Sequence, residues 1–353
     1  MLALQAVTPE ALAHAARLVT LAEARKIVSA VHRDRALDTP VAQVRRDALA
    51  AVRAAGDVPT LRVHGEEPSS LDPFVKLTLS THDDHLIETV RIPLERSGRF
   101  SVCVSSQVGC ALACTFCATG RLGLARNLEA WEIVEQVRIV RRGLDLRRGE
   151  RVHGVVFQGM GEPMANLDRV LDAIRVLCHP SALAIDARAI TVSTSGIPSG
   201  IRRLAREARK VRLALSIGSA RKTVRRTLMP IEGAHPFDEV LDACVEHARR
   251  TGLAPMWAVT LLAGVNDTVE DAHALAQVAR AFAERAGIDA AHEERDRPRL
   301  SLPVKNRSGP VSPCFRPSRP LVLLISQAGI DSGLQFKKSS KKPQQVRQAI
   351  HVG

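Results

Sequence analysis

Strand-like apolar runs alternate with amphipathic helical stretches over about 200 residues of this chain. Strands are predicted at 100–104, 152–158, 189–193, 211–216, 256–262 and 299–302. Helices are predicted between them, at 128–141, 167–177, 201–208, 237–249 and 269–286. This alternation indicates an α/β fold with a parallel sheet and helices outside it, and we expect a partial (β/α) barrel. Chemistry in such a fold sits at the C-terminal ends of the strands.

The region before residue 100 has a different pattern. Residues 8–56 are predicted to be helical, because apolar residues recur at spacings of three and four in 9–19 and 41–52. Thr39 and Pro40 predict the N-cap and the first position of the second of these helices.

A β-hairpin is predicted next, from alternating residues at 74–80 and 85–93 around a turn at 82–84. Later in the chain, prolines punctuate the sequence after residue 303 and lysines form a basic run at 337–342. The expected divisions are a helical accessory domain at 1–72, a β-hairpin linker at 73–98, the partial barrel at 99–305 and a divergent basic tail at 306–353.

The bulk composition favours a cytoplasmic protein. The chain has no apolar run of about 18 residues, so no transmembrane helix is expected, and its N-terminus lacks the basic region of a signal peptide. Seven cysteines, three of them in one short motif, favour a reducing compartment over a disulfide framework.

The net charge of +13 indicates a polyanionic partner, because lysine and arginine neutralise phosphates. A coding bias is the alternative, since the chain is rich in alanine and arginine and has no tyrosine. Only ten residues are Phe or Trp, so nucleic-acid binding by base stacking is poorly supported.

Three cysteines stand close together at 110, 114 and 117, in the spacing CxxxCxxC. Three thiolates without a nearby fourth ligand suit a 4Fe–4S cluster with one open iron, which can bind and cleave S-adenosylmethionine. A closed zinc site normally has four ligands. The alternatives are zinc binding by the three thiolates and burial of three cysteines as small apolar side chains.

Small and polar residues follow three further predicted strands. GMGEP at 159–163 ends the second strand, STSG at 193–196 the third and SIG at 216–218 the fourth. Glycines let the backbone approach a ligand, and a strand-end carboxylate or hydroxyl can bind an ammonium or a ribose. Tight turns and helix capping are the alternatives.

Two more side chains are candidates for chemistry. Cys103 lies seven residues before the first cysteine of the motif, and on its strand it can point at the same cavity. Glu88 lies in an otherwise apolar strand, where a carboxylate can act as a base. A buried strand cysteine and an outward-facing carboxylate are the alternatives.

These segments together resemble a known family. The runs at 101–120 (SVCVSSQVGCALACTFCATG), 159–163 and 193–196 look like motifs of the RlmN/Cfr family of radical S-adenosylmethionine RNA methyltransferases, and LMPI at 228–231 and GVND at 264–267 are similar to further ones. The resemblance covers about residues 80–310. It implies methylation of an adenine ring carbon, usually carbon-2, in ribosomal or transfer RNA.

In that family, one S-adenosylmethionine methylates a cysteine near the C-terminus, and a second is cleaved to a radical that takes hydrogen from this methyl group. The carbon radical adds to adenine, and another cysteine resolves the adduct after a proton is removed. The resemblance implies RNA and an electron donor as partners.

The resemblance also assigns roles to residues of this chain. It places the cluster on Cys110, Cys114 and Cys117, the resolving thiol at Cys103 and the proton acceptor at Glu88. It lines the S-adenosylmethionine site with Gly161, Glu162, Ser193, Ser216, Gly218 and Asn306.

The chain departs from the family in three places. SIG at 216–218 replaces Ser-Leu-His, LPVKN at 302–306 replaces a Pro-aromatic-Asn ending, and the family's Ala-Cys-Gly-Gln-Leu has no counterpart in 346–353. No cysteine follows Cys314 in the sequence.

Three interpretations of the missing C-terminal cysteine are open. Cys314 carries the methyl group; or the protein performs other radical chemistry or binds RNA without methylating it; or the C-terminal sequence is altered relative to a functional ancestor, for example by a reading-frame shift.

Overall fold

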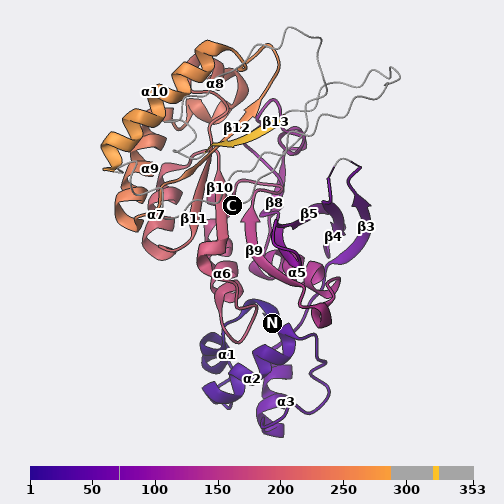
Figure 1. The fold of residues 1–353 in the computed structure, drawn as a ribbon. Coiled ribbons are helices and arrows are strands. Elements are labelled where there is room, and N and C mark those ends of the chain that lie inside the picture. Colours follow the sequence, from indigo (N-terminus) through magenta and orange to yellow (C-terminus); the bar gives the residue numbers. More distant parts are fainter. Residues whose placement is uncertain (71, 288–320, 326–353) are drawn as a thin grey trace.

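The structure of this chain, a computed structural model, describes residues 1–70, 72–287 and the strand at 321–325. A nine-stranded sheet with the order β13-β12-β11-β10-β9-β6-β5-β4-β3 lies at its centre (Figure 1). Five neighbouring strands of this sheet are parallel: β6 (Arg99–Cys103), β9 (Arg151–Phe157), β10 (Ile190–Thr194), β11 (Arg212–Ser216) and β12 (Met256–Leu261). Each matches its predicted strand to within one residue at either end, whereas the sixth predicted strand, at 299–302, lies outside the described residues.

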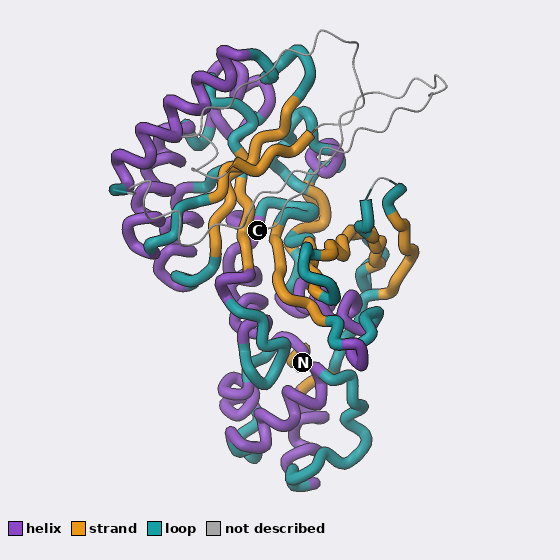
Figure 2. The backbone as a smooth tube through the Cα atoms, in the orientation of Figure 1, coloured by secondary structure: helices purple, strands orange, loops and turns teal. Residues whose placement is uncertain are grey.

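The helices that follow these strands cover the outer face of the sheet (Figure 2). They are α5 (Ala130–Arg142), α6 (Leu167–Cys178), α7 (Pro198–Glu207), α9 (Phe237–Thr251) and α10 (Val269–Ala286). A further short helix, α8 (Lys222–Leu228), packs through Leu228 in a small separate cluster with Cys114. One continuous apolar core fills the space between the sheet and this helical layer. The predicted α/β fold with a partial barrel is therefore confirmed. None of the described helices is long and apolar enough to cross a membrane.

Antiparallel strands extend the sheet at both edges. The predicted hairpin is present as β4 (Val75–Ser80) and β5 (Leu86–Pro93), and β5 pairs with β6. An unexpected strand, β3 (Arg62–Pro68), pairs with β4 and forms the edge of the sheet. Its residues are almost all exposed, so it lacks the alternation of buried and exposed side chains that predicts a strand. At the opposite edge, β13 (Leu321–Ile325) pairs with β12.

Three helices near the N-terminus enclose a second apolar core. They are α1 (Pro9–Ala15), α2 (Leu21–His32) and α3 (Arg46–Ala55), beside a short parallel pair of strands, β1 (Leu2–Ala3) and β2 (Gly56–Asp57). The predicted helix start at Thr39 and Pro40 is wrong, because α3 begins at Arg46. Gln43 has φ 59°, which is incompatible with a right-handed helix, and Arg45 is anchored to Glu23 of α2 over 2.9 Å.

Candidate active site

The cysteine motif occupies a loop between two short paired strands, β7 (Gln107–Gly109) and β8 (Leu124–Asn127). Ala113, between the first two cysteines, has φ 49°, in the left-handed region of backbone conformation. Within the loop, the Cys117 N–H donates to the Cys114 carbonyl over 3.0 Å. A long-range bond anchors the loop to the barrel, because the Thr115 N–H donates to the carbonyl of Leu228, at the end of α8, over 2.9 Å.

The three thiols of the motif lie close enough to influence one another. Cys110 and Cys114 are buried and Cys117 is partly buried. Burial raises the pKa of Cys110, and it raises the pKa of Cys114 to about 11, with smaller contributions from the neighbouring cysteines. A short α-helix, α4 (Ala118–Arg121), follows directly after the third cysteine.

This donor set fits an iron–sulfur cluster in its chemistry. All three donors are soft sulfur atoms, they come from one loop, and none forms a disulfide. Within the described residues, no three His, Cys, Asp or Glu side chains are gathered around a position for one metal ion. A 4Fe–4S cluster has a different requirement, because each thiolate binds a different iron.

The register of the sheet determines which predicted residues share a face. Cys103 pairs with Val156 of β9. When the β9–β10 pairing is continued by one residue, Ser193 lies opposite the residue two positions after Val156. Ser193 in turn pairs with the residue two positions before Ser216. Cys103 also pairs with the residue two positions after Glu88 in β5. Since side chains alternate along a strand, Glu88, Cys103, Ser193 and Ser216 all lie on one face of the sheet.

Glu88 is on this face but is not enclosed by it. Its carboxylate is 48% exposed and forms an ion pair with Lys76 across 3.0 Å, while its backbone carbonyl accepts from the Ser105 hydroxyl over 2.6 Å. Cys103 is more enclosed, and burial raises its pKa to about 12, with a smaller contribution from the nearby Glu88 carboxylate. The structure thus brings Glu88 and Cys103 near each other, with the cysteine in its thiol form.

Glu162 connects three of the loops at the strand ends. Its carboxylate accepts from the Ser195 N–H over 2.8 Å and from the Met164 N–H over 3.0 Å, and its own N–H donates to Gln107 over 2.8 Å. Burial raises its pKa. Gly161 has φ 101°, and a Cβ there would come within 2.7 Å of the Gln107 backbone nitrogen. This position therefore requires glycine.

The predicted hydroxyl residues meet between β10 and β11. The hydroxyl oxygens of Ser193 and Ser216 are 3.5 Å apart. Gly218 follows with φ 68°, and its carbonyl accepts from the side-chain amide of Asn266 over 2.6 Å. The same amide donates to the Thr260 carbonyl over 2.9 Å, so Asn266 joins the ends of β11 and β12.

Arg225 is a site residue that sequence reasoning missed. Its buried guanidinium donates to the backbone carbonyls of Ser195, Ser216 and Ile217, and to the carboxylate of Glu232. It therefore holds the strand-end loops of β10 and β11 together. The local sequence does not distinguish Arg225 from the other arginines of the chain, because its partners include backbone carbonyls of separate loops.

Two residues named in the sequence analysis lie outside the part of the chain that the structure describes. Asn306, predicted to line the S-adenosylmethionine site, lies outside the described residues, as does Cys314. The remaining predicted residues lie at or near the C-terminal edge of the parallel strands or on the shared face.

Comparison with known proteins gives consistent results. Residues 104–279 match the model of the radical SAM superfamily. The chain is similar to a "Probable RNA methyltransferase" of Sorangium cellulosum, with 60% identity over 304 residues that cover 85% of this chain and 75% of that protein. It is similar to a "Probable dual-specificity RNA methyltransferase RlmN" of Chlorobium chlorochromatii, with 44% identity over 61% of this chain and 59% of that protein. The crystal structure of a radical SAM methyltransferase from Sphaerobacter thermophilus superimposes with a TM-score of 0.71 and 35% identity, over 79% of this chain and 82% of that one.

Proposed function

Because this chain belongs to the RlmN/Cfr family of radical S-adenosylmethionine enzymes, we propose that it methylates an adenine ring carbon, namely carbon-2, in ribosomal or transfer RNA of the cytoplasm. The observation that carries this proposal is the common face of Glu88, Cys103, Ser193 and Ser216, next to a loop with three cysteines. An acid–base group, a thiol and two hydroxyls then share one face of the sheet. The net charge of +13 supports a polyanionic substrate.

The cofactors are assigned to residues by their chemistry. Cys110, Cys114 and Cys117 hold a 4Fe–4S cluster, which when bound supplies the electron that cleaves S-adenosylmethionine. Five residues at the strand ends bind S-adenosylmethionine: Gly161, Glu162, Ser193, Ser216 and Gly218. A sixth, Asn306, is assigned by family resemblance alone.

Glu88 and Cys103 act on the RNA adduct. Glu88 accepts the proton from the adenine ring, and its carboxylate forms an ion pair with the ammonium of Lys76 across 3.0 Å. Cys103 resolves the covalent adduct. Because burial raises the pKa of Cys103 to about 12, its thiol must lose a proton before the sulfur attacks the adduct.

One assay tests this function. Anaerobically reconstituted protein is mixed with S-adenosylmethionine, a reductant and unmodified ribosomal or transfer RNA, and methyladenosine and 5′-deoxyadenosine are measured together by mass spectrometry. We expect both products, with 2-methyladenosine as the modified nucleoside, and neither from Cys114→Ala. Absence of methyladenosine would contradict the proposal.

The alternative function is RNA binding, or other radical chemistry, without methyl transfer. It is favoured by the sequence at 346–353, which has no cysteine where the resemblance places the methyl carrier. It predicts 5′-deoxyadenosine, or RNA binding alone, without methyladenosine. If methyladenosine forms, Cys314→Ala then tests whether that thiol is the carrier.

A further inference from the structure

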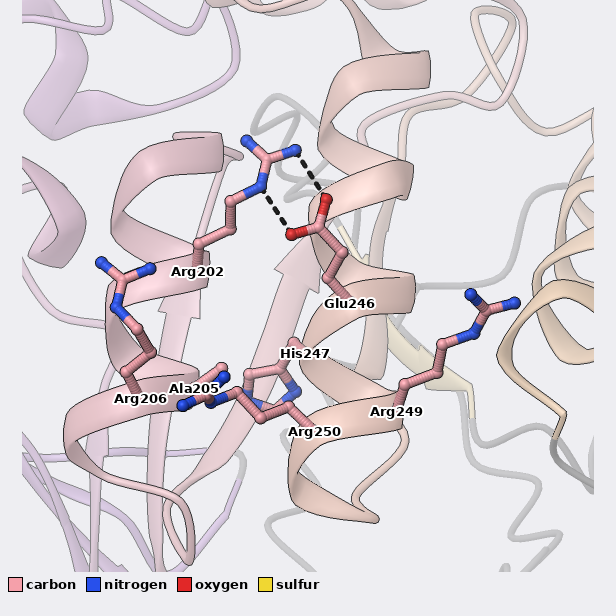
Figure 3. A pocket seen from close by; sticks show the side chains of 7 residues that line it. All are labelled: Arg202, Ala205, Arg206, Glu246, His247, Arg249 and Arg250. Atoms are coloured by element: carbon pink, nitrogen blue, oxygen red, sulfur yellow. Dashed lines mark hydrogen bonds and ion pairs between the residues drawn. The ribbon is translucent and has the colours of Figure 1, made fainter.

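A basic groove lies on the outer surface of the barrel, between helices α7 and α9 (Figure 3). It encloses about 420 Å³, which is room for roughly a dozen water molecules. Its lining consists of Arg202, Ala205, Arg206, Glu246, His247, Arg249 and Arg250. Four of these seven residues are arginines and one is acidic, so the groove carries a net positive charge.

The arginines of the groove differ in how their charge is compensated. Arg202 forms a two-pronged ion pair with Glu246, at 2.8 and 3.0 Å. Arg249 extends away from α7 and donates to the carbonyl of Arg285 (Figure 3). Arg206 and Arg250 are exposed, and neither forms an ion pair with any described residue. Two guanidinium groups without an ion-pair partner among the described residues therefore line the groove, one from α7 and one from α9.

Helix dipoles do not account for this excess of charge. Arg206 and Arg250 lie in the last turns of α7 and α9, where a cation stabilises the negative end of each helix. Each helix end contributes only about half a negative charge. The two helix ends together therefore offset about half of the positive charge of Arg206 and Arg250.

A buried imidazole lies beneath the groove. His247 is fully buried, and neither of its ring nitrogens has a hydrogen-bond partner. The Leu253 backbone lies near enough to favour the protonated form slightly, but it makes no bond of normal geometry. An unpartnered buried polar group destabilises the folded state, because it has lost its bonds to water without gaining others. His247 lines the groove, so its imidazole is an unsatisfied polar group next to a ligand bound there.

We propose that this groove binds a phosphodiester of the RNA substrate, away from the reacting base. Arg206 and Arg250 supply the charge, and guanidinium groups match the oxygens of a phosphate in geometry. This inference rests on the proposed function, because it takes the bound RNA to be the molecule that is methylated.

The position of the groove suits an extended RNA. Helix α7 begins at Pro198, three residues after Ser195 at the edge of the candidate active site. Arg206 lies eight residues further on, which is about 12 Å along the helix axis. A nucleic-acid strand places a phosphate roughly every 3.4 Å along its axis, so a few nucleotides span this distance.

The test compares three double variants of the reconstituted full-length protein in binding unmodified transfer RNA at several salt concentrations. Arg206→Gln with Arg250→Gln should weaken binding roughly tenfold and reduce the slope of log affinity against log salt by about 1–2. Arg206→Lys with Arg250→Lys should keep the slope, because the charges remain. Arg147→Gln with Arg280→Gln is the matched control, because it removes two exposed charges that have no ion pair among described residues and lie outside the groove.

The outcomes separate the two proposals. If the wild-type protein binds RNA and the groove variant behaves like the control, the groove inference is wrong while the proposed function stands. If the wild-type protein does not bind RNA, the proposed function fails, and the groove inference fails with it. A third result is that inorganic phosphate raises the melting temperature of the wild type but not of the groove variant, while the two proteins have the same slope of log RNA affinity against log salt. The groove would then bind free phosphate, and its assignment to RNA would be overturned.

Discussion

Arg225 donates from its Nε atom to a carboxylate oxygen of Glu232 over 2.9 Å, and both side chains are buried. The same guanidinium donates to the carbonyls of Ser195 and Ile217, in loops that follow β10 and β11. An interior ion pair therefore fixes the spacing of two loops to which we assign S-adenosylmethionine binding.

Replacing Arg225 by Met should lower the free energy of unfolding by about 3–5 kcal/mol, because Glu232 is left as an unpaired buried charge. Urea unfolding of the cluster-free protein measures this change. Arg226→Met is the matched control, since Arg226 is the exposed neighbour on the same helix. Adding Glu232→Leu to Arg225→Met should restore part of the stability but not S-adenosylmethionine binding, because the loop carbonyls still lack their donor.

Removing any one cysteine of the motif should abolish the cluster. Cys110→Ala, Cys114→Ala and Cys117→Ala are each expected to lose the iron, sulfide and brown colour of the reconstituted protein, because three ligands are the minimum for this site. Cys178→Ala, at the end of α6, should reconstitute normally. Full iron content in a motif variant would contradict the ligand assignment.

Glu88→Gln should slow methylation by a factor of roughly 100 or more, which is the usual contribution of a general base, while leaving 5′-deoxyadenosine formation unchanged. Glu67→Gln is the matched control, because Glu67 contacts the same Lys76 across 3.2 Å. Single-turnover methylation and deoxyadenosine release separate the two steps. Equal methylation rates for the two variants would remove Glu88 from the mechanism.

Cys103→Ala should stop the reaction after the adduct has formed. We expect a covalent protein–RNA species to accumulate, because the thiol that we assign to resolve it has been removed from the sheet face. A denaturing gel detects this species as a protein that migrates with RNA. Release of methylated RNA at the wild-type rate would show that another group resolves the adduct.

Gly161→Ala should destabilise the folded protein and weaken S-adenosylmethionine binding. Its φ of 101° is unfavourable for any residue with a side chain, and the added methyl group would clash with Gln107. Gly65→Ala is the control, because a Cβ at that position meets no atom within 4 Å. Thermal unfolding and equilibrium dialysis measure the two effects. Identical behaviour of both variants would remove the special role of Gly161.

The protein should lose stability in mild acid because of its buried histidines. Burial lowers the pKa of His247 to about 4 and that of His32 to about 3. The unfolded chain takes up protons below about pH 6.5 whereas the folded chain does not, so stability falls as the pH drops from 6.5 toward 4. His247→Leu should reduce the loss between pH 8 and pH 4.5 by about 2–3 kcal/mol, measured by urea unfolding. Parallel stability profiles for the variant and the wild type would contradict this.

The parallel core was predictable because its strands and helices carry strong periodic patterns. Strand β10 is buried along its whole length and β9 over its last four residues, and α10 was predicted with its observed boundaries, 269–286. Strand β3 was not predictable, because its side chains are exposed and its pairing depends on β4, several residues later in the sequence. Edge strands of this kind are defined by tertiary contacts rather than by local pattern.

The site residues could be predicted where the chemistry requires a particular residue type. They could not be predicted where a side chain only holds loops together in the folded protein. The cysteines and the glycine-rich segment at 159–163 could be identified from their spacing. The roles of Arg225 and Asn266 could not, because they donate to backbone carbonyls, which every residue has. Only the folded arrangement of the loops shows which carbonyls these side chains reach.

The bond from Thr115 to Leu228 has a consequence for the order of events during synthesis. Leu228 is translated 111 residues after Cys117, which takes roughly 6–22 s at about 5–20 residues per second. During that interval the three thiols have left the ribosome without the barrel segment that anchors their loop. Cofactor loading in the cell is therefore expected to follow completion of much of the barrel, and the nascent chain is the stage at which these thiols are most vulnerable to oxidation.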